Sequence, residues 1–351
     1  MFTASYIKHQ LQFLKPAKTS RNTMQTHTVY YVKLEHKLTH KIYWGEAAPL
    51  PGLSIDNVTL IEQKIANLCQ QVTDGCNYEM LDFEEFNSVK FAFETAFLSS
   101  THKHNFMVYD TPFYHGNQLI DINGLVWMNE PITMLEEAIS KAEAGFTTIK
   151  FKVGALDFDE ECRMIESFRK LFNAFKINIR LDANGAFKND EALQQIKALS
   201  RFEIDSIEQP IKQKQWDVMQ GICAKSPIAI ALDEELIGVD VHTNGNQLLQ
   251  HIKPQHIILK PTLLGGLKNS EHWVKLAHKN NIGWWATSAL ESNIGLNAIA
   301  QWTSTQQLQT PQGLGTGGLY SNNIASPLLV DKGKLSYVQG ESWGTVISNQ
   351  D

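Results

Sequence analysis

The sequence predicts an α/β protein in which repeated strand–helix units form a (β/α)8-type barrel beside a smaller α+β unit. The chain has 351 residues, too many for one small core, so we expect a barrel-sized domain with a smaller partner. From residue 121 onward, short apolar runs alternate with helix-like segments, as in folds built from parallel strands. Before residue 121, strand-like runs come first and helix-like stretches follow.

The first part of the chain is expected to form a sheet packed against helices. Three runs alternate apolar and polar residues, which indicates an antiparallel meander: "SYIKHQLQFL", "THTVYYVKLEH" and "KIYWGEA". Two stretches then repeat apolar residues every three to four positions, as amphipathic helices do: 57–72 and 86–100. Residues 1 to about 120 are therefore interpreted as the α+β unit.

The second part of the chain is expected to form the barrel. Its strand-like runs are "IDINGLVWM", "TTIKFKVG", "KINIRLDANG", "IDSIEQP", "IAIALDEE", "HIILKPTLLGG" and "GWWATSALES". Helix-like segments such as 131–145 and 189–202 lie between them. The charged residues that end these runs are spaced by 30, 26, 25 and 27 positions along the series Lys152, Asp182, Glu208, Asp233 and Lys260. Seven or eight units at this pitch form a parallel barrel.

The composition excludes several classes of protein. A formal net charge of −6, a pI near 6.1 and the lack of a long Lys/Arg run argue against a nucleic-acid-binding surface. No stretch reaches the roughly 18 apolar residues of a membrane span, and the N-terminal residues do not resemble a signal peptide. We expect a cytoplasmic protein that acts on a small molecule. The cysteines lack the spacing of a metal site and are expected to be free thiols: Cys69, Cys76, Cys162 and Cys223.

Two lysines on one predicted strand are the first sign of a functional site. In the run 147–154, Lys150 and Lys152 share one face while apolar residues take the other. Taken alone, this pattern is more typical of the wet face of an antiparallel strand. In a parallel barrel both faces of a strand are buried, so the two ammonium groups are expected to point into the mouth of the barrel.

Three acidic residues, Asp182, Glu208 and Asp233, end three successive predicted strands. Because the carboxyl ends of barrel strands lie at one end of the barrel, these carboxylates should converge, and their repulsion is costly without a cation. Oxygen ligands alone favour a hard cation, and Mg²⁺ fits best. Each acid by itself could instead belong to a turn, a strand end or a helix N-cap. Their regular spacing favours the shared metal site.

The lysines beside this predicted metal site suggest proton chemistry. A free lysine, with a pKa of about 10.4, is a poor base at neutral pH, but a second ammonium group and a divalent cation both disfavour its charged form. Lys150 is therefore expected to help make Lys152 a base, with Lys260 on the other flank. A carboxylate substrate on the metal would lose its α-proton to Lys152 and form a metal-stabilised enediolate.

The series of strand ends, "KFK", "LDAN", "IEQP", "LDEE" and "LKP", resembles that of the enolase superfamily, in its muconate-lactonizing-enzyme subgroup. This superfamily uses a lysine or histidine base beside Mg²⁺. Within it, the chain is most similar to the o-succinylbenzoate synthase family, through "YWGEAAPLPGLS" at 43–54, "TSALESNIGLNAIAQW" at 287–302 and "GLGTGGLYSNN" at 313–323. The resemblance covers nearly the whole chain. It implies a (β/α)7β TIM-like barrel at 121–320, an α+β capping domain at 1–120 and a C-terminal segment at 321–351 that returns to the cap.

The resemblance also implies an activity, the Mg²⁺-dependent syn-dehydration of 2-succinyl-6-hydroxy-2,4-cyclohexadiene-1-carboxylate to o-succinylbenzoate, a lyase reaction of menaquinone biosynthesis. The three carboxylates would bind Mg²⁺. Lys152 would remove the α-proton and then protonate the departing hydroxyl, while Lys260 would stabilise the planar intermediate by charge and cation–π attraction. The loop 43–54 would act as a lid. Substrate contacts are expected at Pro51, Gly52, Asn184, Ser288, Glu291 and Ser292.

Other functions stay open at this point. Lysines on both sides of a metal also suit an N-acylamino acid racemase or a dipeptide epimerase of the same subgroup. Dipeptide epimerases carry an Asp-x-Asp pair near the eighth strand, where this chain has "GLGTGG", and this difference counts against them. A non-catalytic barrel that binds a carboxylate has no reason to flank a metal with three lysines. The "GLGTGG" run also lacks the βαβ unit of a dinucleotide site, so no such cofactor is expected.

Overall fold

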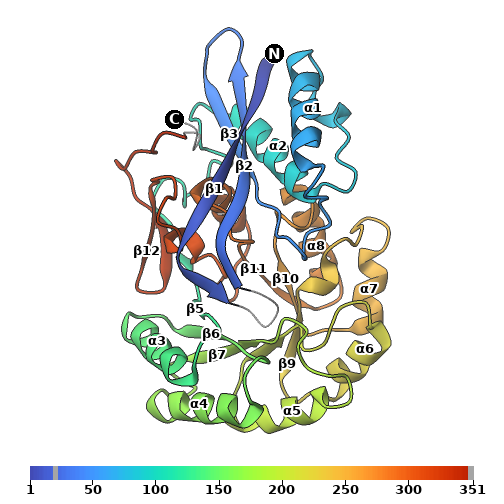
Figure 1. The fold of residues 1–351 in the computed structure, drawn as a ribbon, viewed down its shortest axis with the longest axis vertical. Helices are drawn as coiled ribbons and strands as arrows, with labels where there is room; N and C mark the ends of the chain where they lie inside the picture. Colours follow the sequence, from blue (N-terminus) through green and yellow to red (C-terminus); the bar gives the residue numbers. More distant parts are fainter. Residues whose placement is uncertain (19–22, 347–351) are drawn as a thin grey trace.

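The structure is a computed structural model that describes residues 1–18 and 23–346. Figure 1 shows a small N-terminal unit, called the cap below, lying against one end of a larger α/β unit. The cap contains a three-stranded antiparallel sheet in the order β1 (Phe2–Lys18), β2 (Thr23–His36) and β3 (Ile42–Ala47). Its helices are α1 (Ile61–Thr73), the short η1 (Tyr78–Met80) and α2 (Asn87–Ser100).

The cap has its own apolar core between the sheet and the helices. Helix α1 buries one face at helical spacing, and this face packs with α2 against the sheet. The helix begins at Ile61 rather than at the predicted residue 57, because the Asn57 side chain accepts a hydrogen bond from the Thr59 N–H (3.0 Å) and forms a turn there. The other strands and helices of this unit follow the predicted pattern closely.

The larger unit is a curled parallel sheet of seven strands covered by helices (Figure 1). Its strands are hydrogen-bonded in chain order: β5 (Gly124–Val126), β6 (Thr148–Lys152), β7 (Asn178–Asp182), β8 (Ser206–Glu208), β9 (Ala229–Leu232), β10 (His256–Leu259) and β11 (Gly283–Ala286). The helices between and after them are α3 (Pro131–Glu143), α4 (Phe158–Leu171), α5 (Ala192–Leu199), α6 (Trp216–Lys225), α7 (Gly245–Ile252), α8 (Leu267–Lys279) and α9 (Asn293–Ser304). Short 3-10 turns are η2 (Ser200–Phe202) and η3 (Glu234–Leu236). The main core lies between this sheet and these helices.

The eighth strand is reduced to a pair of bridges that close the barrel. Gln312 forms a parallel bridge with Ile122, and Gly313 forms one with Thr287. A side chain at Gly313 would lie 2.3 Å from the Thr287 hydroxyl, so only glycine permits this approach. After these bridges the chain continues through a short 3-10 turn, η4 (Thr316–Gly318), instead of the longer strand expected from "GLGTGGLYSNN".

The predicted run 120–128 divides into two strands of different sheets. Strand β4 (Ile120–Asp121) joins an antiparallel sheet in the order β12 (Leu328–Asp331), β13 (Lys334–Tyr337) and β4, whereas β5 pairs with β6. The chain between the barrel and β12 returns to the cap, where Leu14 N–H donates to Leu319 O (2.8 Å) and Ser321 N–H donates to Gln12 O (2.9 Å). No helix within the described ranges is long and apolar enough to cross a membrane.

Candidate active site

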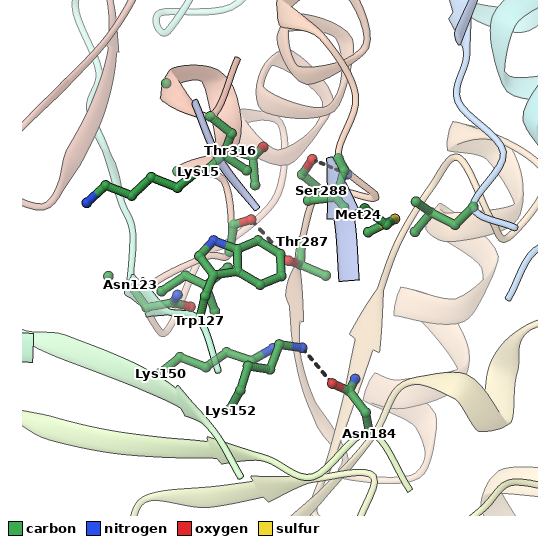
Figure 2. A pocket seen from close by; sticks show the side chains of 18 of the residues that line it. Lys15, Met24, Asn123, Trp127, Lys150, Lys152, Asn184, Thr287, Ser288 and Thr316 are labelled. Carbon is green, nitrogen blue, oxygen red and sulfur yellow. Dashed lines mark hydrogen bonds between the residues drawn. The ribbon is translucent and has the colours of Figure 1, made fainter. Parts of the chain in front are cut away.

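A cavity of about 410 Å³ lies between the cap and the carboxyl ends of the barrel strands. This volume is in the range of pockets that enclose a small molecule, roughly 300–1,000 Å³. The barrel contributes polar residues to its wall, among them Lys150, Lys152, Asn184, Lys260 and Ser288. The cap contributes mainly apolar ones, among them Leu14, Met24, Leu50, Pro51 and Leu53. Figure 2 shows the two neighbouring lysines and Trp127 at this cavity.

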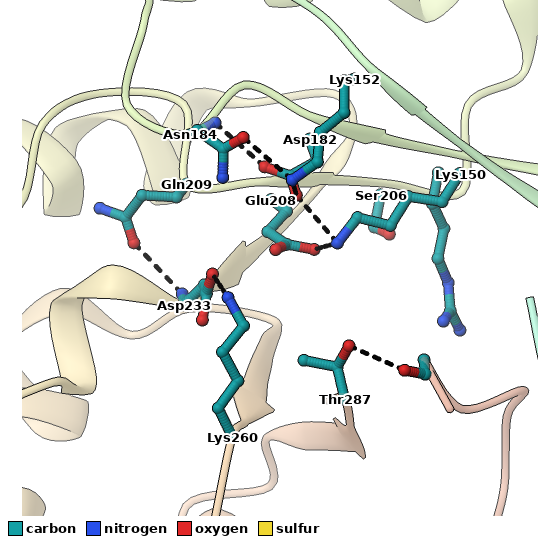
Figure 3. A network of polar contacts seen from close by, with 12 residues as sticks. Lys150, Lys152, Asp182, Asn184, Ser206, Glu208, Gln209, Asp233, Lys260 and Thr287 are labelled. Carbon is teal, nitrogen blue, oxygen red and sulfur yellow. Dashed lines mark hydrogen bonds and ion pairs between the residues drawn. The ribbon is translucent and has the colours of Figure 1, made fainter. Parts of the chain in front are cut away.

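The three predicted metal ligands lie side by side behind the lysines that line the cavity. Lys152, Asp182 and Glu208 occupy matching positions on β6, β7 and β8, and Asp233 directly follows β9. The carboxylates of Asp182, Glu208 and Asp233 are 0%, 2% and 1% exposed. Figure 3 shows them as a row with a lysine at each end.

Each carboxylate of this row faces an ammonium group. Lys152 Nζ lies 2.5 Å from Asp182 Oδ2 and also donates to Asn184 Oδ1 (2.9 Å). Lys150 Nζ lies 2.9 Å from the same Asp182 oxygen and donates to Glu208 Oε2. Lys260 Nζ donates to Asp233 Oδ2. Three lysines and three carboxylates are thus paired beside the cavity.

Burial and charge shift the pKa values of these groups in opposite directions. For Asp182, burial would raise the pKa, but Lys150 and Lys152 hold it well below its usual value. The pKa of Glu208 is raised well above its usual value by burial and by the neighbouring Asp182. Burial would lower the pKa values of Lys150 and Lys260, but the carboxylates beside them raise both. Burial and the neighbouring carboxylate thus oppose the negative charge of Glu208, whereas the carboxylates support the positive charges of Lys150 and Lys260.

The backbone beyond the carboxylates is strained where it presents side chains to the site. Asn184 and Gln209 have left-handed backbone angles, with φ of 46° and 37°. Asn184 Nδ2 donates to Glu234 Oε1 (3.1 Å), which helps to hold its amide oxygen toward Lys152. The Gln209 amide oxygen accepts the Asp233 N–H (3.2 Å) and fixes the backbone of that carboxylate. Such strain is common at functional sites, where the surrounding contacts over-determine the conformation.

The expected substrate-contact residues divide into two groups. Pro51, Gly52, Asn184 and Ser288 line the cavity. Glu291 and Ser292 do not line it, because both are fully buried and their polar atoms bind other protein groups. Both residues belong to the segment 287–302 that resembles the family, but the loop after β11 turns their side chains away from the cavity.

Several lining residues were missed by the sequence analysis. Leu125 and Trp127 lie at alternating positions of the β5 segment and face the cavity, so strand periodicity could have identified them. Met24 and Lys15 lie on the arms of the β1–β2 hairpin, and nothing in the sequence indicates that this hairpin reaches the barrel. Thr316 belongs to the turn after the reduced eighth strand.

Glu46 of β3 is a buried carboxylate that joins the cap to the barrel. It is fully buried, and its Oε1 accepts the Ser292 N–H (2.7 Å). Its Oε2 accepts the Ser292 hydroxyl (2.6 Å) and the Gly295 N–H (2.8 Å), at the N-terminus of α9. The carboxylate therefore caps a barrel helix from the other domain.

Glu46 is expected to make stability depend on pH. Burial raises its pKa from 4.5 to about 7, although its hydrogen bonds favour the charged form. Between these two values the folded protein holds one proton more than the unfolded chain, so the free energy of unfolding falls as pH rises, by about 3 kcal/mol. Urea unfolding at about pH 5 and about pH 8 should show this fall in the wild type and a smaller fall in Glu46→Gln. An equal pH dependence in both proteins would contradict the assignment.

Comparisons with known proteins agree with this architecture. Residues 133–348 match the family model described as "Enolase C-terminal domain-like". The o-succinylbenzoate synthase of Desulfotalea psychrophila is 40% identical, over 94% of this chain and 98% of that protein. The crystal structure of MenC from the same organism has a TM-score of 0.85 and 37% identity, and covers 95% of this chain and 99% of that chain. The L-Ala-D/L-Glu epimerase of Bacillus subtilis has a TM-score of 0.83 at 20% identity, with 97% and 96% covered, which shows a shared fold.

These matches confirm the fold class predicted from the strand–helix pitch. The family model covers more than half of the chain, and the identity to the Desulfotalea psychrophila enzyme extends over almost all of it. The chain therefore belongs to the enolase superfamily and, within it, to the o-succinylbenzoate synthase family.

Proposed function

We propose that this protein is an o-succinylbenzoate synthase that dehydrates 2-succinyl-6-hydroxy-2,4-cyclohexadiene-1-carboxylate to o-succinylbenzoate, a step of menaquinone biosynthesis. The observation that supports this best is the row of carboxylates with Lys152 at one end and Lys260 at the other, since both lysines line the same cavity (Figure 3). A 40% identity to a named o-succinylbenzoate synthase over nearly the full length favours this reaction over others of the superfamily.

The side chains of Asp182, Glu208 and Asp233 fit a divalent cation such as Mg²⁺. Within residues 1–18 and 23–346, no group of three Asp, Glu, His or Cys side chains surrounds a common metal position. Asp182, Glu208 and Asp233 are turned toward lysines instead. Glu208 Oε1 nevertheless is buried without a hydrogen-bond partner, and the ammonium group of Lys150 bridges the first two carboxylates. A site that already attracts positive charge and leaves a carboxylate oxygen unsatisfied suits a hard cation. Bound there, Mg²⁺ would supply positive charge for the substrate carboxylate as its α-proton leaves.

One lysine carries out both proton transfers, and the other two supply positive charge. In its neutral form, Lys152 takes the α-proton, which forms a new N–H bond and leaves a planar anion. Lys152 then gives a proton to the hydroxyl as the C–O bond breaks, so water departs and the ring becomes aromatic. Lys260 remains charged on the other flank and stabilises the anion. Lys150 adds a second positive charge beside Lys152, where it lies between Asp182 and Glu208.

The cap makes the cavity suitable for this reaction. Pro51 and Gly52 lie on a loop that covers the cavity together with the apolar side chains of Leu50 and Leu53. Apolar covering excludes water, which would otherwise weaken the interactions between substrate and charged groups. Asn184 and Ser288 add polar contacts on the barrel side.

The direct test is turnover by purified protein in the presence of Mg²⁺. We expect the cyclohexadiene carboxylate to be converted to o-succinylbenzoate with kcat/KM of at least ~10⁴ M⁻¹s⁻¹, the lower end for natural enzymes. Loss of the substrate's diene absorbance measures the rate. Absence of turnover, together with efficient racemisation of an N-acylamino acid or a dipeptide, would contradict the proposal.

Replacing Glu208 with glutamine tests the metal site. Since burial and the neighbouring carboxylates oppose the charge of Glu208, the amide should change stability little when Mg²⁺ is removed by EDTA. Loss of a ligand should lower Mg²⁺ affinity by more than about 100-fold, because even the partners of metal ligands contribute about 10–100-fold. Calorimetric titration with Mg²⁺ and thermal unfolding in EDTA measure the two quantities. Unchanged affinity and activity in Glu208→Gln would remove Glu208 from the metal site.

A further inference from the structure

The loop Ser288–Ser292, between β11 and α9, connects the cavity to the cap. Ser288 and Leu290 line the cavity at one end of this loop. At its other end, the backbone and side chain of Ser292 are both bound by Glu46. The loop is therefore fixed from the cap side by a carboxylate that does not itself line the cavity.

Glu291 links the same loop to the segment that carries Lys260. Its Oε1 accepts a hydrogen bond from the Thr262 hydroxyl, two residues beyond Lys260. Its Oε2 accepts the Ser288 hydroxyl and the Ala289 N–H (2.8 Å). Because Glu291 immediately precedes Ser292, any movement of Ser292 reaches both the wall of the cavity and the Lys260 segment.

The loop needs these external contacts, because its own backbone is strained. Leu290 has a left-handed conformation, with φ of 67°, that a branched side chain rarely adopts. Its carbonyl oxygen accepts a hydrogen bond from the Tyr320 hydroxyl (2.6 Å). In the first turn of α9, a side chain at Gly295 would lie 2.7 Å from Glu291 Cβ and 3.1 Å from Glu46 Oε2, so glycine permits the close approach of both residues. A strained loop persists only where its surroundings hold it.

We propose that Glu46 is a positioning residue of the reaction, which acts through Ser292 and Glu291 to hold Ser288, Leu290 and Lys260 in their catalytic arrangement. The part of the test that measures turnover rests on the proposed function. Glu46 thereby couples the placement of the cap to the chemistry, beyond any contribution to folding.

Glu94 of α2 offers a matched control. It is also a buried cap carboxylate at a helix N-terminus of the barrel, since it accepts the N–H groups of Leu267 (2.6 Å) and Lys268 (3.0 Å) at the start of α8. It makes no contact with the loop Ser288–Ser292 among the hydrogen bonds of the described residues. Glu46→Gln and Glu94→Gln therefore each take one accepting oxygen from the N-terminus of a barrel helix, but only Glu46→Gln frees the loop Ser288–Ser292.

Two measurements separate positioning from general stability. Glu46→Gln should lower kcat by about 10- to 100-fold with a smaller change in KM, as expected when a small displacement spoils alignment, whereas Glu94→Gln should keep kcat within about twofold. Hydrogen exchange, without substrate, should become faster at residues 288–296 in Glu46→Gln and at the start of α8 in Glu94→Gln. Ser292→Ala removes the hydroxyl contacts with Glu46 and with the Ile294 N–H (3.3 Å) but keeps the bond from the Ser292 N–H to Glu46. It should show a weaker effect of the same kind and serves if Glu46→Gln does not fold.

The outcomes that overturn the proposal are distinct from failure of the proposed function. Equal losses of kcat in the two glutamine variants would assign the effect to general contact between cap and barrel. Wild-type kcat in Glu46→Gln, or unchanged exchange at residues 288–296, would remove Glu46 from a positioning role. If the wild type does not act on the cyclohexadiene substrate, the proposed function fails, while the exchange measurement still decides whether Glu46 holds the loop.

Discussion

Replacing Lys152 with alanine is expected to lower kcat for the dehydration by about 10⁴-fold, because the α-proton then has no base in the cavity. Lys152 is 8% exposed, and its Nζ is oriented by Asp182 (2.5 Å) and the Asn184 amide oxygen (2.9 Å). Steady-state turnover, together with exchange of the substrate α-proton in deuterium oxide, measures the loss.

Lys150→Ala is the matched control for Lys152→Ala. Lys150 lies two residues away on the same strand face and is equally buried, but its ammonium group bridges Asp182 and Glu208. Its removal takes away one positive charge near the base without removing the base, so the loss of kcat should be clearly smaller. If Lys150→Ala lost as much proton exchange as Lys152→Ala, the assignment of the base to Lys152 would be wrong.

The convergence of the three carboxylates was predictable because its information lies in the strand spacing. Asp182, Glu208 and Asp233 recur once in each strand–helix repeat, and the carboxyl ends of parallel strands lie at one end of the barrel. Asp182 and Glu208 are paired in register, and Asp233 follows the end of β9. The pairing of each carboxylate with a particular lysine was not predictable. It depends on side-chain torsions and on the lateral order of the lysines, which a one-dimensional pattern does not contain.

Contacts between the two domains were the main features that sequence patterns did not reveal. Glu46 lies in a strand whose alternating apolar and polar residues predict only the sheet of the cap. Its partner Ser292 is 246 positions away in the sequence. The reduced eighth strand was also not expected, since two bridging residues leave no periodicity to detect. Local sequence patterns therefore predicted the helices and strands. The contacts that join the cap to the barrel depend on tertiary packing, which these patterns do not contain.

Replacing Lys260 with arginine is expected to separate dehydration from racemisation. In dehydration the hydroxyl leaves from the face that Lys152 serves, so Lys260 needs only to stay positive beside Asp233. Arginine keeps this charge, although its planar and bulkier group will reduce the rate through altered geometry. In racemisation Lys260 must both give and take a proton, and arginine, with a pKa above about 12, cannot do so at neutral pH.

We therefore expect Lys260→Arg to retain measurable dehydration and to lose any racemisation completely, whereas Lys260→Ala, which removes the charge, should impair both. Racemisation is measured as deuterium incorporation into N-acylamino acids and dipeptides in deuterium oxide. In the wild type these side reactions should be far slower than dehydration. If the wild type instead racemised an amino acid derivative efficiently and left the cyclohexadiene carboxylate unchanged, Lys260 would be the second proton-transfer group of a racemase, and the synthase assignment would be wrong.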